Sequence, residues 1–158
     1  MPAAKLSTAQ ATSLIQVTWD ASPNLDEFLR FINAYAKGRF SNSQAERIAL
    51  ASNELLDNAL RYGSLAREFS YRLDIGSARV SVCVQNTTVL ARIEMLTAQL
   101  RRLESSPELV YASELERSTH GGGRRSMLGL ARIRHEAEMK LELTLDGLDV
   151  TMCAHCKR

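Results

Sequence analysis

The order of apolar and polar residues along the chain predicts a mixed α/β domain. Residues alternate between the two classes from Ser13 to Trp19, which is typical of a β-strand. Apolar positions then recur at helical spacing from Leu25 to Tyr35, after a Ser22-Pro23-Asn24 start. Gly38 suits the C-terminal cap of this first helix.

A longer helix is expected from Ser41 to Tyr62, because Ser41 and Gln44 have the spacing of a capping box and Gly63 follows the last turn. One side of this helix carries small and apolar residues that should pack against a sheet. They are Ala45, Ile48, Ala49, Ser52, Leu55, Leu56, Ala59 and Leu60. The opposite side carries Glu54, Asp57, Asn58 and Arg61.

The remainder predicts paired strands and shorter helices. Strands are expected over 69–75 and 80–85, and helices over 89–103, 108–115 and 127–135. A closing hairpin over 139–153 should turn at Asp146-Gly147. The pattern predicts an α+β two-layer sandwich, with a mixed, mostly antiparallel sheet and helices on one face. The apolar seam of 89–103 fits the core, and the alternative is a surface for a partner or for a homodimer.

Length and composition fit one domain over residues 12–155, preceded by a flexible N-terminus at 1–11. Hydrophobic residues make up 45% of the 158, yet no run is long enough to span a bilayer and no secretory signal opens the chain. We therefore expect a cytoplasmic protein without a membrane segment. The net charge of +2 is spread along the chain, which argues against nucleic-acid binding.

The three cysteines give no clear site. Cys153 and Cys156 form a single C-x-x-C, whereas a structural zinc site needs four ligands, and Cys83 could join them only through the fold. A reducing cytosol keeps thiols free. We expect incidental thiols at the end of a strand.

Two side chains on the outward face of the long helix suggest chemistry. Glu54 and Asn58 lie one helical turn apart and can reach the same point. A carboxylate can accept a proton from an attacking hydroxyl, and an amide oxygen suits Mg²⁺. The alternative is a solvated face on which Asp57 and Arg61 form an ion pair of little energetic value.

Other residues fit a phosphate site. The glycines at 121–123 could bring backbone amides close to phosphates, and the helix near Met127 would offer its N-terminus to an anion. Arg61 could offset phosphate charge, and a purine could stack on Tyr62.

The segment 54–63, ELLDNALRYG, resembles the N-box of the GHKL ATPase superfamily, which has the Bergerat ATP-binding fold. Its E-x-x-x-N form is similar to that of the anti-sigma-factor and serine-kinase branch. The segment 126–133, SMLGLARI, resembles the later glycine box, in which G-x-G-L-G-L precedes a helix. The resemblance covers residues 12–155.

This resemblance implies roles for individual residues. Glu54 would be the general base, Asn58 the Mg²⁺ ligand, and Arg61 a neighbour of the phosphates. The remaining expected contacts to ATP are Tyr62, Asn86, Gly121, Gly122, Gly123, Ser126, Gly129 and Leu130. Asn86 stands where the superfamily has the aspartate that binds the adenine amino group. The D-x-G-x-G box is missing, and Met127 replaces a small residue of the glycine box.

The resemblance implies an ATP- and Mg²⁺-binding regulator of a bacterial partner-switching type system. Such proteins phosphorylate a serine or threonine of a STAS-domain antagonist, a PP2C-type phosphatase reverses the reaction, and a sigma factor is another partner class. The alternative is a degenerate module of the same fold that sequesters a partner without phosphoryl transfer.

Overall fold

A computed structural model describes residues 11–20, 24–64, 68–120 and 127–158. These ranges contain five strands and five helices. The strands are β1 (Thr12–Trp19), β2 (Phe69–Ile75), β3 (Arg79–Thr87), β4 (Lys140–Asp146) and β5 (Asp149–Lys157). The helices are α1 (Leu25–Arg39), α2 (Asn42–Tyr62), α3 (Leu90–Ser105), α4 (Pro107–Thr119) and α5 (Leu128–His135).

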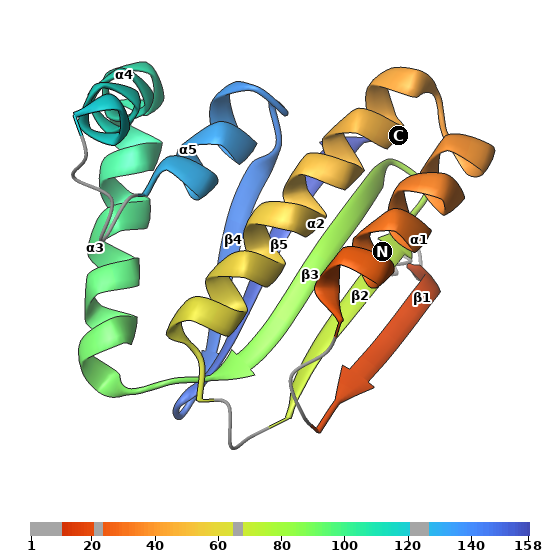
Figure 1. Cartoon of the computed structure of the whole chain (residues 1–158), viewed down its shortest axis with the longest axis horizontal. Coiled ribbons are helices and arrows are strands. Elements are labelled where there is room, and N and C mark those ends of the chain that lie inside the picture. Colours follow the sequence, from red (N-terminus) through yellow and green to blue (C-terminus); the bar gives the residue numbers. More distant parts are fainter. Residues whose placement is uncertain (1–10, 21–23, 65–67, 121–126) are drawn as a thin grey trace, which may run out of the picture.

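The strands form one sheet in the order β1-β2-β3-β5-β4. Each pairing is antiparallel, so the expected mixed sheet is wholly antiparallel in the described residues. The helices lie on one face of the sheet, with α2 across its middle (Figure 1). The α+β two-layer sandwich is confirmed.

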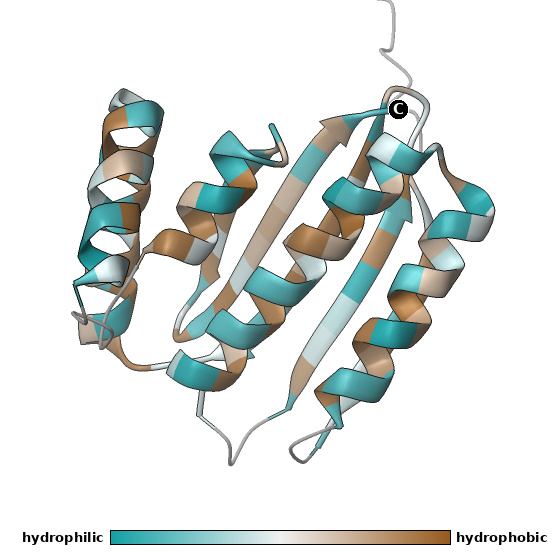
Figure 2. Ribbon diagram, turned by 45° about the horizontal axis from the view of Figure 1, so that its top comes forward, coloured by the Kyte–Doolittle hydropathy of each residue, from teal (hydrophilic) through white to brown (hydrophobic). Residues whose placement is uncertain are grey.

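Hydrophobic segments occur on both the helices and the strands (Figure 2). The buried apolar residues of both layers form one core cluster. Ile32 of α1, Leu56 of α2 and Leu73 of β2 have no exposed surface. Ser52, the one polar residue of the predicted inward stripe of α2, donates to the Ile48 carbonyl at 2.7 Å and bonds the Tyr71 hydroxyl at 2.8 Å. Six of the eight residues of the predicted stripe are buried, and Ala49 and Leu60 are half-buried. The polar member of the stripe is hydrogen-bonded inside the core.

The ends of the long helix follow the prediction. The Gln44 amide donates to the Ser41 hydroxyl oxygen, and the Gly63 amide donates to the Ala59 carbonyl at 2.8 Å. The cap predicted at Gly38 is wrong: α1 continues to Arg39 and Phe40 is its C-cap. A glycine inside a helix costs stability but does not end it.

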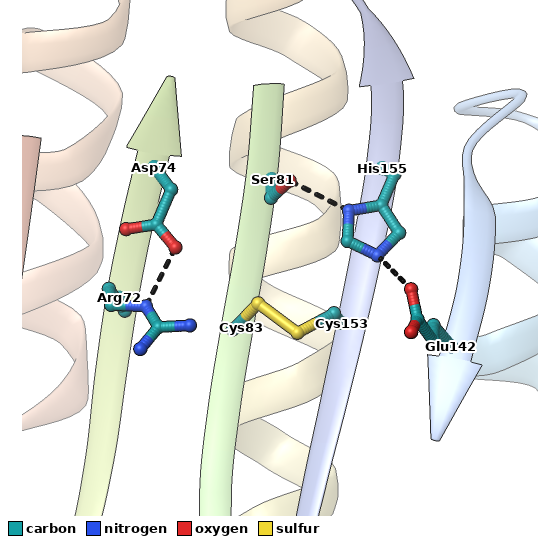
Figure 3. Close-up of a disulfide and its surroundings, with 7 residues drawn as sticks. All are labelled: Arg72, Asp74, Ser81, Cys83, Glu142, Cys153 and His155. Atoms are coloured by element: carbon teal, nitrogen blue, oxygen red, sulfur yellow. Dashed lines mark hydrogen bonds and ion pairs between the residues drawn. A yellow bond between two sulfur atoms is a disulfide. The ribbon is translucent and has the colours of Figure 1, made fainter. Parts of the chain in front are cut away.

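The cysteine prediction is also corrected. Cys83 of β3 lies directly opposite Cys153 of β5, and the two form a disulfide on the face of the sheet turned away from the helices (Figure 3). Cys153 lies within β5 rather than at its end, and Cys156 is a buried free thiol. The spacing along the chain hid this pairing, because strand register brings together residues 70 positions apart.

None of the helices in the described ranges combines the length and the apolar character of a membrane span.

Candidate functional site

Four of the predicted residues line one pocket between α2, α3 and the sheet. Asn58 and Tyr62 come from α2, Asn86 from the end of β3, and Leu130 from α5. Most of the remaining wall is apolar and includes Leu55, Val84, Met127 and Met152. The fold therefore brings the two carboxamides together from positions 28 residues apart in the chain.

Asn86 is held against the C-terminal end of α2. Its Nδ2 donates to the Ala59 carbonyl at 3.5 Å. A Cβ at Gly63 would lie 2.6 Å from that nitrogen and 2.4 Å from the Ala59 oxygen, so the helix end can approach Asn86 only with glycine there. With its amide nitrogen turned to Ala59, Asn86 keeps its oxygen as the acceptor for another group.

Tyr62 already has an aromatic-face contact. The Arg92 guanidinium of α3 lies 4.8 Å from the centre of the ring, a cation–π arrangement. Arg92, Met95 and Gln99 of α3 cover the pocket on this side. The free space is about 70 Å³, below the roughly 300–1,000 Å³ of most small-molecule sites.

Glu54 lies beside this pocket rather than in its wall. Its Oε1 accepts from Arg132 Nη1 at 2.6 Å, and only 12% of its side chain is exposed. The pKa of this carboxyl is raised above its ordinary value, chiefly by burial, although the charge of Arg132 opposes the rise. A Cβ at Gly129 would lie 2.5 Å from Glu54 Oε2, so the predicted glycine-box residue contacts the predicted base instead of lining the pocket.

Arg61 lies away from the pocket. It pairs with Asp57 at 2.8 Å, and about half of each side chain is exposed. This is the solvated ion pair that the sequence offered as the simpler interpretation. Gly121, Gly122, Gly123 and Ser126 lie outside the described residues.

The sequence predicts that the start of α5 attracts an anion. In the structure this anion is a carboxylate of the protein itself, that of Glu114. The Met127 amide donates to Glu114 Oε2 at 3.0 Å, and Glu114 is 1% exposed. Arg117 pairs with the other oxygen of this carboxylate at 3.2 Å. The Glu114 carboxylate therefore lies at the start of α5, where the sequence predicted a phosphate.

In the described ranges, no three His, Cys, Asp or Glu side chains converge as a metal site. A Mg²⁺ ion at this pocket would therefore depend on the Asn58 oxygen together with phosphate oxygens and water, a donor set that Mg²⁺ accepts.

A polar row that the sequence pattern did not reveal lies on the other face of the sheet and consists of Ser81, His155 and Glu142 (Figure 3). His155 Nδ1 lies 2.7 Å from Ser81 Oγ, and its Nε2 lies 3.0 Å from Glu142. Burial and the charge of Arg79 lower the pKa of His155, so the neutral ring accepts from Ser81 and donates to Glu142. Ser81 is only 6% exposed, and we interpret the row as a structural network. The signal was strand register, which places Ser81 opposite His155.

The fold is similar to that of a chain in the crystal structure of the SiaB-SiaC complex from Pseudomonas aeruginosa. The TM-score is 0.65, the sequence identity is 13%, and the match covers 92% of this chain and 91% of that chain. At this identity the likeness concerns the fold. No family model matches the sequence, and no curated protein matches it.

Proposed function

We propose that this protein is a cytoplasmic ATP-binding regulator with a Bergerat-type fold, which phosphorylates a serine or threonine of a partner protein. The observation that carries the proposal is the meeting of Asn58 and Asn86 in one pocket, with Glu54 one turn away on the same helix.

The types of residue that line the pocket suit a nucleotide. Apolar walls would hold a purine, and the Asn86 oxygen would accept from its amino group. Asn58 would hold Mg²⁺, which neutralises phosphate charge. Because the free space is small, binding would move the α3 side chains Arg92, Met95 and Gln99 outward. Release of Arg92 would also free one face of Tyr62.

The transfer step would use Glu54 as the base. The partner hydroxyl oxygen forms a bond to the γ-phosphorus, the bond from that phosphorus to the β,γ-bridging oxygen breaks, and ADP leaves. The hydroxyl proton passes to the Glu54 carboxylate. The buried position of Glu54 suits this role because desolvation makes a carboxylate more basic.

A protein partner is supported by the similar structure, which is that of the SiaB-SiaC complex. In a partner-switching type system the substrate would be a STAS-domain antagonist, with a PP2C-type phosphatase in the same pathway and a sigma factor as another partner class.

Calorimetric titration with ATP and Mg²⁺ tests the proposal. Asn58→Ala should abolish binding of the Mg²⁺ complex, whereas Glu54→Gln should keep binding and lose transfer. Asn53→Ala is the matched control, because Asn53 lies exposed on the same helix. Absence of heat at millimolar nucleotide would contradict the proposal.

The second candidate is an adaptor that sequesters a partner without nucleotide, and the Glu114 carboxylate at the start of α5 favours it. A helix N-terminus that is already capped by a buried acid has less to offer to a phosphate. This function predicts partner binding that is unaffected by ATP or by Asn58→Ala. A pull-down whose yield depends on nucleotide would exclude it.

A further inference from the structure

Arg132 of α5 joins two carboxylates that belong to different parts of the molecule. Its Nη1 donates to Glu54 of α2 at 2.6 Å. Its Nε and Nη2 donate to the two oxygens of Glu136 at 3.0 and 3.3 Å. The guanidinium plane is therefore fixed by a two-point contact on one side while its remaining nitrogen holds Glu54.

A further contact supports this arrangement from α4. The Tyr111 hydroxyl donates to Glu136 Oε1 at 2.9 Å, and the Tyr111 ring stacks on His135 at 4.2 Å between centres. Tyr111 thus fixes Glu136, and Glu136 in turn fixes Arg132. The chain of contacts ends on the one carboxylate of α2 that lies beside the pocket.

Among the described residues, Arg132 is the side chain that forms an ion pair with Glu54. Gly129 closes against Oε2, and Asp57 and Glu136 are the acidic groups that act on it. Without a cation, a mostly buried carboxylate among acidic neighbours would take up a proton or turn toward water. In the part of the chain that the structure describes, Arg132 is the cation that opposes both.

We propose that Arg132 is a positioning residue, which holds the Glu54 carboxylate charged and oriented beside the nucleotide pocket. This inference rests on the proposed function, because it gives Arg132 the role of positioning Glu54, the base of the proposed transfer. It predicts that Arg132 affects the rate of phosphoryl transfer rather than the affinity for ATP.

The test uses the purified full chain with ATP and Mg²⁺, with water as the phosphoryl acceptor. Water oxygen bonds to the γ-phosphorus, the bridging bond breaks, ADP and phosphate leave, and the proton goes to Glu54. Arg132→Ala should lower kcat by about tenfold or more, as expected for loss of a positioned base, with KM for ATP little changed. Arg132→Lys should restore part of the rate, since it returns the charge without the two-point geometry.

Two controls separate positioning from a general loss of structure. In a Glu54→Gln background, Arg132→Ala should have no further effect on kcat. Arg134→Ala removes an arginine of the same helix that donates to the Met139 carbonyl instead, and it should leave kcat unchanged. A wild-type rate in Arg132→Ala, no rescue by lysine, or an equal loss in the Glu54→Gln background would overturn the inference.

A second measurement decides the case in which the wild-type chain hydrolyses no ATP. That result would not contradict the proposed function, because the proposed acceptor is a protein hydroxyl and this assay contains only water. The carboxyl carbon signal of Glu54 is then followed by NMR in wild-type protein and in Arg132→Ala. A clear shift of this signal would support the positioning contact, and an unchanged signal would overturn it.

Discussion

At the scale of single residues, the absence of a side chain at Gly129 leaves room for the Glu54 carboxylate. We expect Gly129→Ala to push the Glu54 carboxylate away, because the new Cβ would lie 2.5 Å from Oε2. The variant should lose stability although alanine favours helices. Urea unfolding measures the change. Gly38→Ala is the matched control: nothing lies within 4 Å of its Cβ, and it should gain about 0.5–1 kcal/mol. A gain of that size in Gly129→Ala would contradict the described contact.

His155 should make stability depend on pH. Its pKa in the folded protein is lowered, first by burial and then by Arg79, against the opposing effect of Glu142 and Asp74. The unfolded chain therefore binds the proton more readily, and stability should fall as the pH drops below about 6.5. Urea midpoints at about pH 5 and pH 7.5 should differ less in His155→Gln than in wild type. An equal difference in both would show that His155 is not responsible.

The two outward residues of α2 were predictable from helical spacing alone, because positions one turn apart share a face. The ion-pair partner of Glu54 was not predictable in this way. The sequence suggested Arg61, a near neighbour, as the arginine of the site, whereas Arg132 reaches Glu54 from 78 positions away. Contacts of that kind depend on how helices pack, and no local pattern encodes them.

At the scale of elements, local capping chemistry determines where α2 begins. The Ser41 hydroxyl accepts from the Gln44 amide, so Ser41→Ala should lower the free energy of unfolding by about 1 kcal/mol. Chemical denaturation checks this, with Ser43→Ala as the control on the exposed first turn. Equal effects of the two substitutions would contradict the cap.

The disulfide links β3 to β5 across 70 residues of chain. Under non-reducing denaturation only Cys156 should react with a thiol reagent. The double variant Cys83→Ala with Cys153→Ala should be less stable by about 2–4 kcal/mol than the oxidised protein. Reactivity of all three cysteines would show that the bond does not form, as a reducing cytosol would favour.

Periodicity predicted which segments are strands and which are helices, because burial of one face repeats every two residues in a strand and every 3.6 residues in a helix. The errors fell where tertiary structure decides. Gly38 stays inside α1 because the helix continues to Arg39 and is followed by Phe40, which packs against the core. Cys153 lies mid-strand because β5 pairs with β3 as far as Lys157.

At the scale of the whole molecule, the position of the pocket follows from the placement of the helices on one face of the sheet. Helices cover one face of the sheet (Figure 1). The pocket is lined by residues of α2, α3, α5 and the sheet. The sequence predicted this architecture, and it gave Asn58, Tyr62 and Asn86 as expected contacts to ATP; these three residues line the same pocket. It did not predict that α3 side chains would fill much of the space or that Glu114 would cap α5, because both follow from the packing of distant helices.

The central claim is that Asn58 and Asn86 bind a nucleotide together. The most direct measurement follows their side-chain amide signals by NMR while Mg²⁺-ATP is added to the labelled protein. We predict that both signals shift and saturate together, while the exposed Asn53 signal stays in place. Unchanged Asn58 and Asn86 signals at millimolar Mg²⁺-ATP would contradict the account.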